Sequence, residues 1–243
     1  MTEADTPDVP AAGRAVTVSR TTWLAVGAVL LALVFAGWAT VTALGRDAGG
    51  TGTGAAGAAV PGDESADAGF ARDMSVHHQQ AVEMSFVVRD RTTDEEVRRL
   101  AYDIANTQAN QRGMMLGWLD LWRLPKVAPD REPMSWMGHG DGHGGAHSGH
   151  GSASAADGAL MPGMATRAQM EQLRAASGKA AEVLFLQLMI DHHKGGVDMA
   201  EGCVRACAVP QQKTLAQGMV DAQESEITLM TEMLAKRGAK PRA

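Results

Sequence analysis

The fold is decided by a stretch of fifteen residues that occurs twice in the chain. FARDMSVHHQQAVEM (residues 70–84) recurs as FLQLMIDHHKGGVDM (residues 185–199), at a constant offset of 115. Both copies have the pattern F-x3-M-x2-H-H-x5-M, and Ala81 is matched by Gly196, a small residue in both. Similarity held at a fixed offset indicates an internal duplication.

The match continues after each motif, where a short break precedes a second apolar stripe. The breaks are RTTD (residues 91–94) and AVP (residues 208–210), and Thr92 or Thr93 is expected to cap the helix that begins near Asp94. The matched positions downstream are Leu100, Ile104, Gln108, Met115 and Leu119 with Leu215, Met219, Gln223, Met230 and Leu234. Each copy is therefore predicted to form a helical hairpin.

Composition and patterning together predict an all-α fold. Hydrophobic residues make up 45% of the 243 residues and aromatic residues only 4%, with a bias toward Ala, Leu and Met that favours helices over a β-sandwich or barrel. Two hairpins that each bury one face are expected to pack against each other. We predict a four-helix bundle over residues 67–237, with an irregular crossover at residues 125–163.

The repeated motif supplies the candidate metal ligands. On a helix that advances 100° per residue, its Phe, Met, His and small residues fall within an arc of about 120°, which is expected to face the bundle interior. The candidate ligands are Met74, His77, His78, Met84, Met189, His192, His193 and Met199. Imidazole with thioether, and no carboxylate on the arc, suits copper, and thioether favours Cu(I) in particular. The chain has no E-x-x-H, so a ferritin-like di-iron site is not expected.

The alternative interpretation of the motif is an ordinary core. Methionine at helical spacing usually fills a core, and an inward histidine is often a hydrogen-bonded core residue. Four imidazoles buried without partners would, however, cost several kcal/mol, which a metal ion would offset. Glu226 lies on the apolar face of the last helix, with Gln111 at the matching position. Glu226 is expected either to hydrogen-bond a ligand imidazole or to lie at the bundle edge.

Two further groups are candidate secondary ligands. Cys203 and Cys207 extend the second arc, where the first copy has Val88 and Thr92. A disulfide, a plain core position and a thiolate pair remain open for them, although an i,i+4 disulfide has awkward geometry on a regular helix. The crossover contains a His/Gly tract whose imidazoles are His139, His143, His147 and His150. Such a tract is expected to bind divalent ions with modest affinity, or else to be a low-complexity spacer.

The N-terminal part predicts export of the body from the cytoplasm. Thr22–Leu44 carries no charge and is long enough to cross a bilayer, with Trp23 and Trp38 toward its ends. We predict a transmembrane helix with residues 1–21 in the cytoplasm and everything after Leu44 outside. The alternative is a signal peptide cleaved near Val41–Ala43, followed by secretion. Both interpretations place the body outside the cytoplasm.

Three motifs resemble those of the domain-of-unknown-function-305 family. They are the paired M-x2-H-H, the M-P-G-M of Met161–Met164 and the Q-x2-E-I-x2-M of Gln223–Met230. The resemblance covers residues 67–237 and implies an exported bacterial protein with a ferritin-like bundle, of a family in which some members bind copper. It also implies that the four motif histidines and their flanking methionines are ligands.

The chain departs from that family pattern at two places. Gln111 and Arg112 stand where a second E-I would be expected, and Gly195–Gly196 where Gly-Ala is typical. The first departure means that the two halves are not expected to bind metal equally.

We therefore expect a membrane-anchored, extracytoplasmic protein that buffers, sequesters or hands on copper, as Cu(I), Cu(II) or both. A flexible linker at residues 45–66 would tether the bundle. A net charge of −6 argues against nucleic acid as a partner, which leaves the membrane, the metal ion, other copper-handling proteins and a second copy of the chain. No nucleophile elbow, phosphate loop or paired-carboxylate motif is visible, so the sequence favours a binding protein over an enzyme. A metal oxidase and a structural or interaction module are the two rival hypotheses.

Overall fold

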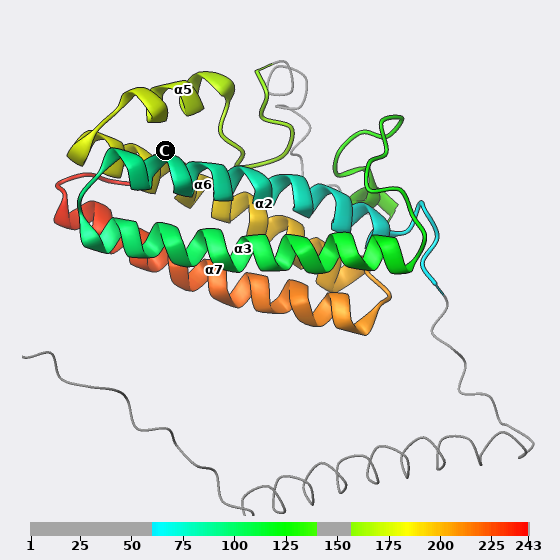
Figure 1. Ribbon diagram of the computed structural model, residues 1–243. Coiled ribbons are helices and arrows are strands. Elements are labelled where there is room, and N and C mark those ends of the chain that lie inside the picture. Colours follow the sequence, from blue (N-terminus) through cyan, green and yellow to red (C-terminus); the bar gives the residue numbers. More distant parts are fainter. Residues whose placement is uncertain (1–59, 140–156, 243) are drawn as a thin grey trace, which may run out of the picture. The chain divides into compact units, whose positions relative to one another are not determined.

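The computed structural model describes residues 60–139 and 157–242, and every regular element in them is helical (Figure 1). The elements are α2 (Ala66–Arg91), α3 (Glu95–Leu121), the 3₁₀ helix η1 (Ser135–His139), α5 (Arg167–Ala175), α6 (Gly178–Ala206) and α7 (Pro210–Lys236). The predicted all-α fold is confirmed.

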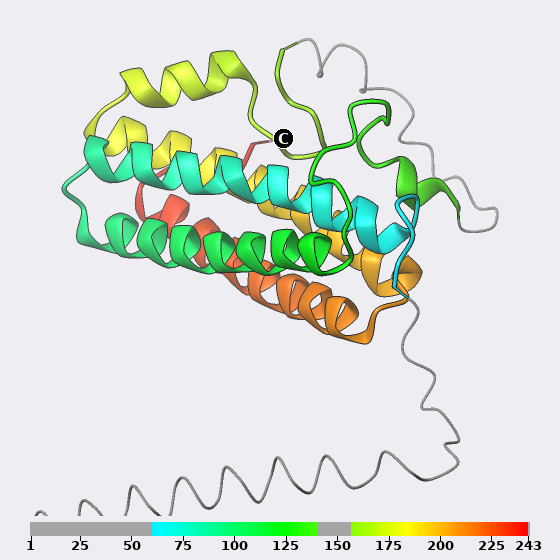
Figure 2. The ribbon, with the colours of Figure 1, turned by 45° about the vertical axis from the view of Figure 1, so that its right-hand side comes forward.

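The bundle consists of two hairpins joined through their first helices. Helices α2 and α3 pack as one hairpin, α6 and α7 pack as the other, and α2 lies against α6 (Figures 1 and 2). The short helix α5 covers α2 and α6 on the side away from α3 and α7. The predicted four-helix bundle from two duplicated hairpins is thus present, with α2 and α6 as its central pair.

The crossover is longer than predicted, and its last part contains a helix. It was expected to end at residue 163, but α6 begins only at Gly178, and α5 occupies residues in between. Thr166 begins α5 with a capping box, in which its hydroxyl accepts the Gln169 N–H and the Gln169 amide oxygen accepts the Thr166 N–H. A short amphipathic helix with its own cap therefore interrupts what looked like the start of the second copy.

The first break is capped by a different residue from the one predicted. Asp94 is the N-cap of α3, and its carboxylate accepts the Val97 N–H at 2.9 Å. Thr92 supports it from outside the helix, since its hydroxyl accepts the Asp94 N–H at 3.0 Å. A carboxylate directly before the first turn also favours the helix dipole, which explains why aspartate rather than threonine takes this position.

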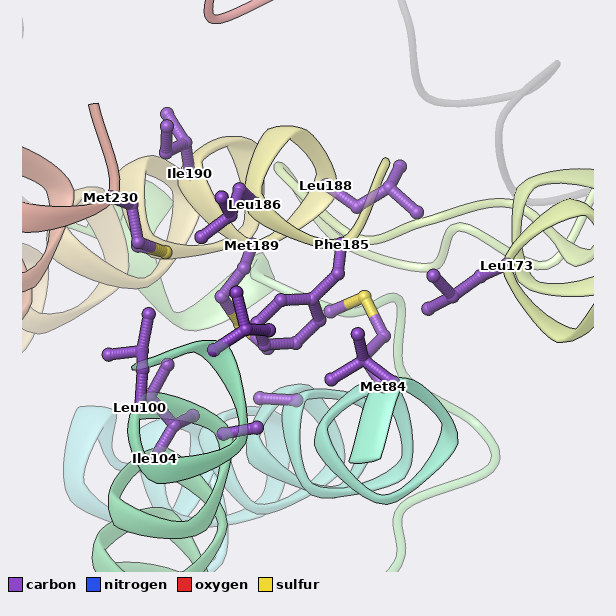
Figure 3. Close-up of a cluster of buried hydrophobic side chains, with 14 of the residues drawn as sticks. Met84, Leu100, Ile104, Leu173, Phe185, Leu186, Leu188, Met189, Ile190 and Met230 are labelled. Atoms are coloured by element: carbon purple, nitrogen blue, oxygen red, sulfur yellow. The ribbon is translucent and has the colours of Figure 1, made fainter. Parts of the chain in front are cut away.

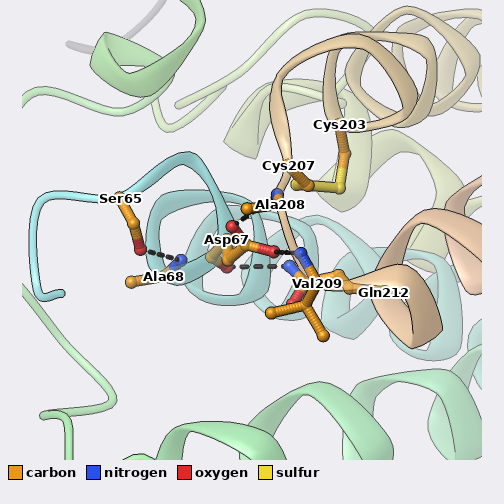
Figure 4. Close-up of a disulfide and its surroundings, with 8 residues drawn as sticks. All are labelled: Ser65, Asp67, Ala68, Cys203, Cys207, Ala208, Val209 and Gln212. Atoms are coloured by element: carbon orange, nitrogen blue, oxygen red, sulfur yellow. Dashed lines mark hydrogen bonds between the residues drawn. A yellow bond between two sulfur atoms is a disulfide. The ribbon is translucent and has the colours of Figure 1, made fainter. Parts of the chain in front are cut away.

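Two carboxylates at matching positions tie each hairpin to the break of the other. Asp67 accepts the backbone N–H groups of Ala208 and Val209, both at 2.9 Å (Figure 4). Glu182, which is 115 residues further along, accepts the Thr92 hydroxyl at 2.6 Å. The duplication thus extends to these two sets of hydrogen bonds between the halves, which we call the reciprocal clasps.

The two cysteines form a disulfide at the end of α6 (Figure 4). Cys203 is the partner of Cys207, and the two Cα atoms lie 4.8 Å apart. The helix ends at Ala206, and Cys207 has an extended backbone, so the awkward geometry expected for a pair on a regular helix does not arise. Of the three alternatives the structure has the disulfide, and the interpretation of Cys203 and Cys207 as thiolate metal ligands is wrong for this oxidised form.

Reducing this disulfide is expected to lower the unfolding free energy by no more than about 2 kcal/mol, because it closes a loop of only five residues. Asp67 holds the same break independently, so the bundle should stay folded. Thermal unfolding followed by circular dichroism with and without dithiothreitol measures the effect. The double variant Cys203→Ala/Cys207→Ala should match the reduced protein, and loss of the helical signal at 25 °C in either case would contradict this expectation.

A segment of the crossover is fastened over the beginning of α2. The carboxylate of Asp73 accepts the Met134 N–H at 2.8 Å and the Trp136 indole N–H at 2.9 Å. The Trp136 ring packs edge-on against Phe70, with ring centroids 5.8 Å apart. Gly69 makes this possible, since a Cβ there would lie 2.5 Å from the indole. The crossover therefore forms part of the core rather than a free loop.

Apolar clusters lie on both sides of the midpoints of α2 and α6. The first, which we call the Phe185 cluster, is drawn in Figure 3 and includes Met84 and Met189. The second, the Phe70 cluster, includes Met74 and Met199. All four methionines are completely buried. Each cluster thus takes one motif methionine from each copy, as expected where two duplicated helices cross antiparallel.

Several predictions concern residues outside the described part of the chain. These are the transmembrane or signal segment Thr22–Leu44, residues 1–21, most of the 45–66 linker, and His143, His147 and His150. His139 is the last residue of η1. Among the helices between residues 60 and 242 that the structure describes, none has the length and hydropathy of a membrane span.

Candidate functional site

Four histidines meet where α2 crosses α6, between the two apolar clusters. His77, His78, His192 and His193 are completely buried. The His77 and His192 rings stack across the interface between the hairpins, with centroids 3.8 Å apart and planes inclined by 33°. We call these four side chains the histidine layer. Their burial confirms the prediction that the repeated motif faces the bundle interior.

Two histidines donate a hydrogen bond to the second helix of their own hairpin. His78 Nε2 lies 2.8 Å from Gln111 Oε1, and His193 Nε2 lies 2.6 Å from Glu226 Oε2. Both pairs are separated by 33 residues, so the arrangement is duplicated with the motif. Of the two roles expected for Glu226, the structure has the hydrogen bond to an imidazole, and Gln111 makes the corresponding contact in the first copy.

The other two histidines bind backbone carbonyls. His192 Nε2 lies 3.0 Å from the carbonyl oxygen of His77 in the opposite hairpin. His77 Nε2 lies 3.2 Å from the carbonyl oxygen of Pro162, in the M-P-G-M segment of the crossover. This pair departs from the symmetry of the duplication, since the crossover is present only once.

These contacts fix which ring nitrogen carries the proton. Carbonyl, amide and carboxylate oxygens only accept, so each Nε2–H donates and the lone pair of each neutral imidazole lies on Nδ1. All four Nδ1 atoms are buried without a hydrogen-bond partner among the described residues. A buried polar atom left unsatisfied costs about 1–3 kcal/mol. A histidine that donates one ring N–H to an oxygen and presents the other nitrogen is the usual arrangement of a metal ligand.

Burial also keeps the rings of His77, His78 and His192 neutral. Desolvation lowers the pKa of His77 to about 4 and that of His78 to about 3, and it lowers the pKa of His192 well below its ordinary value. The nearby imidazoles add to this effect, because two protonated rings would repel each other. Metal binding requires the neutral ring, and these three histidines have it at neutral pH without competition from protons.

Two glycines let the crossover reach the histidine layer. Gly163 has a positive φ of 77°, and a Cβ there would lie 2.3 Å from the Asp191 carbonyl oxygen. On α6, a Cβ at Gly195 would lie 2.0 Å from the Pro162 carbonyl oxygen. The absence of both side chains allows the M-P-G-M segment to lie directly on α6, where it supplies the acceptor for His77.

Buried glutamines add further polar atoms that the sequence analysis did not assign to the site. Gln108 and Gln223 occupy matching positions on α3 and α7, and both are buried. The Gln223 amide oxygen lies against Gly196, where a Cβ would approach it to 2.4 Å. Both amide oxygens lack a hydrogen-bond partner within the described residues. The sequence could have indicated these two glutamines, because a polar residue recurs at an offset of 115 in an otherwise apolar stripe.

The remaining predicted ligands lie around this layer. Met74 and Met189 each precede a histidine pair by about one helical turn, within the Phe70 and Phe185 clusters respectively. Across residues 60–139 and 157–242, no group of three or more His, Cys, Asp or Glu side chains has the arrangement of a metal site. A cavity of about 440 Å³ lies between α2 and residues 126–136, lined by Arg72, Asp73 and Trp136 among others, and the four histidines are not part of its lining.

Comparison with known proteins identifies relatives of this body. The family model described as "Domain of unknown function (DUF305)" matches residues 67–234. No curated protein matches the chain. A crystal structure of a DUF305 protein from Streptomyces coelicolor, a candidate secreted protein, is 62% identical, with a TM-score of 0.65, and the match covers 75% of this chain and 99% of that one.

Two other solved structures are similar at lower identity. A DUF305 fragment from Deinococcus radiodurans is 28% identical, with a TM-score of 0.54, over 70% of this chain and 96% of that one. CopM in its Cu(I)-bound form is 20% identical, with a TM-score of 0.50, over 70% of this chain and 96% of that one. At that identity the likeness to CopM is one of fold.

Proposed function

Because the chain belongs to the DUF305 family, whose function its description leaves open, we propose a function from the histidine layer: the protein binds a soft metal ion, copper, and buffers it, sequesters it or passes it on. The observation that carries the proposal is the set of four buried Nδ1 lone pairs, each on a ring whose Nε2–H is held by an oxygen. A metal ion bound at Nδ1 would satisfy atoms that are otherwise left unpaired.

The chemistry of the donors favours copper over harder ions. The histidine layer offers imidazole nitrogens, and the motif methionines in the clusters on either side of it offer soft sulfur atoms. Imidazole with thioether selects copper, and Cu(I) above all, whereas Mg²⁺ and Ca²⁺ require oxygen ligands. We propose His77, His78, His192 and His193 as the primary ligands, with Met74, Met84, Met189 and Met199 as the sulfur donors.

Two further observations support the proposal and its setting. CopM, a protein of similar fold, has been crystallised with Cu(I), with Cu(II) and with silver. The Cys203–Cys207 disulfide is typical of an oxidising compartment, and the relative from Streptomyces coelicolor is a candidate secreted protein. We therefore propose that the body works outside the cytoplasm, with Thr22–Leu44 as its transmembrane anchor or as a cleaved signal peptide.

The test compares two double variants of the full chain. His78→Leu/His193→Leu is expected to lose tight Cu(I) binding, measured by competition with a chromophoric Cu(I) chelator. Met74→Leu/Met189→Leu conserves volume and should cost less than about 1.5 kcal/mol of stability per site. If the thioethers are ligands, this second variant keeps its fold and binds Cu(I) more weakly.

Stability of the metal-free proteins separates binding from an ordinary core. If the histidine layer is only an ordinary core, the variant His78→Leu/His193→Leu leaves Gln111 and Glu226 without their hydrogen-bond donors. Its free energy of unfolding should then fall by about 1–3 kcal/mol per site. As a metal site, the metal-free variant should lose less than this, because removing two unsatisfied Nδ1 atoms offsets part of the cost of leaving Gln111 and Glu226 without their donors. Unchanged Cu(I) binding with a lower Tm would overturn the proposal and leave an interaction module. Turnover of reduced metal by the parent would instead support the metal oxidase.

A further inference from the structure

We propose that the histidine layer binds one cation, and that this cation lies beside His193, in the half formed by the second copy. Among the described residues, Glu226 is the only carboxylate that is hydrogen-bonded to a histidine of the layer, and it belongs to this half. This inference rests on the proposed metal binding and adds where the ion lies and which residue decides it. Glu226 acts as a positioning residue through His193 and would not itself contact the metal.

At the hydrogen bonds of His78 and His193 the two halves have the same geometry and differ in charge. His193 donates to the Glu226 carboxylate at 2.6 Å, and His78 donates to the Gln111 amide oxygen at 2.8 Å, from the same position of each hairpin. A carboxylate one imidazole ring away makes the Nδ1 lone pair more basic and offsets the charge of a cation bound there. An amide offers the hydrogen bond without the charge.

The next residue along each helix increases this difference. Arg112 follows Gln111, and its Nε is buried with no hydrogen-bond partner among the described residues. Ile227 follows Glu226 and packs against the Phe185 cluster. The first half therefore has a cationic side chain where the second has an apolar one, which adds to the difference in charge between the two halves.

Asp191, the other carboxylate beside the layer, does not alter this balance. It precedes His192 in the chain, but its charge is offset by Arg242, at 3.7 Å, and by Lys194. Its side chain is about one-third exposed, so water screens it as well. Glu226 is left as the carboxylate that acts on the layer, and only through His193.

The experiment uses Ag(I) as a redox-inert probe of the same charge as Cu(I). The full chain, with His139, His143, His147 and His150 replaced by serine to remove the tract, is titrated with Ag(I) by calorimetry. The Nδ1 resonances of ¹⁵N-labelled histidine then report the position of the ion. We expect one tightly bound ion, with His193 Nδ1 shifted strongly and His78 Nδ1 little.

Two isosteric variants test the role of charge. Glu226→Gln keeps an acceptor for His193 and should lower Ag(I) affinity by about 10–100-fold, with the Tm of the metal-free protein nearly unchanged. Gln111→Glu, the matched control in the other half, should leave the first ion in place without loss of affinity.

The outcomes separate this inference from the proposed function. Two equivalent ions, a shift confined to His78, or unchanged affinity in Glu226→Gln would overturn the inference while metal binding stands. No Ag(I) binding by the parent at all would overturn the proposed function itself, and with it this inference.

Discussion

Lowering the pH from 7 to about 4 is expected to unfold the metal-free protein. The pKa of His77 falls to about 4 in the folded state and that of His78 to about 3, whereas both lie near 6.5 in the unfolded chain. Above pH 6.5 the rings are neutral in both states and stability does not depend on them. Below pH 6.5 the histidines become protonated in the unfolded chain but stay neutral in the folded one. The free energy of unfolding therefore falls with pH until the pKa of the folded state is reached.

The size of this effect is large compared with the stability of a typical domain. At pH 4 these shifts correspond to a loss of roughly 3 kcal/mol for each of His77 and His78, at about 1.4 kcal/mol per pH unit below 6.5, and His192 adds to them. Net stabilities of domains are about 5–15 kcal/mol. Burial raises the pKa of Asp73 and Asp191, which acts in the opposite direction and reduces the net slope.

Urea unfolding at steps between pH 7.5 and 4.5, in the presence of a metal chelator, measures the slope. The variant His78→Leu removes one titrating ring and should reduce the slope by up to about 1.4 kcal/mol per pH unit. Bound Cu(I) or Ag(I) should hold the rings neutral and shift the transition to lower pH. A metal-free protein equally stable at pH 7 and 5 would show that the histidines are solvated in solution.

Gly195→Ala is expected to be among the most damaging single methyl additions in the bundle. Its Cβ would lie 2.0 Å from the Pro162 carbonyl oxygen, which belongs to the backbone and can move only with the whole M-P-G-M segment. Overpacking of this kind costs about 1–3 kcal/mol or more, and the gain in helix propensity offsets about 1 kcal/mol of it. Because Pro162 is also the acceptor for His77, metal affinity should fall together with Tm.

The adjacent glycine supplies the matched control. Gly196→Ala adds the same methyl group one residue away, but the atom it meets at 2.4 Å is the end of the Gln223 side chain, which can rotate. Its Tm should stay within a few degrees of the parent, whereas Gly195→Ala should lose several degrees at about 2–4 °C per kcal/mol. Equal Tm values for the two variants would show that the segment does not lie on α6 as described.

Much of the bundle and its interior could be predicted because both follow from local periodicity. The offset of 115 identified the hairpins, and helical geometry turned His77 and His192 inward, where they are buried. The pairing of Glu226 with a histidine was also accessible, since it lies on an otherwise apolar face.

The rest depends on contacts between segments far apart in the sequence. Pro162 contributes a backbone carbonyl, and backbone groups have no sequence signature of their own. The separation of α5 from α6, and the extended backbone of Cys207 after α6, both depend on the residue at which a helix begins or ends. Periodicity gives such a boundary only to within a few residues. The division of the motif methionines between two clusters required the crossing of α2 and α6, which neither copy encodes alone.

The reciprocal clasps of Asp67 and Glu182 have a consequence for how the duplicated halves can exist. Each break is completed by a carboxylate from the other half, and the His192 ring donates to a carbonyl of the other half as well. A single hairpin made as a separate peptide would lack both partners and expose its share of the core. The ancestral unit is therefore expected to have existed as a symmetric pair of identical chains, and fusion made that partnership permanent while allowing the two halves to differ, as they do at Gln111 and Glu226.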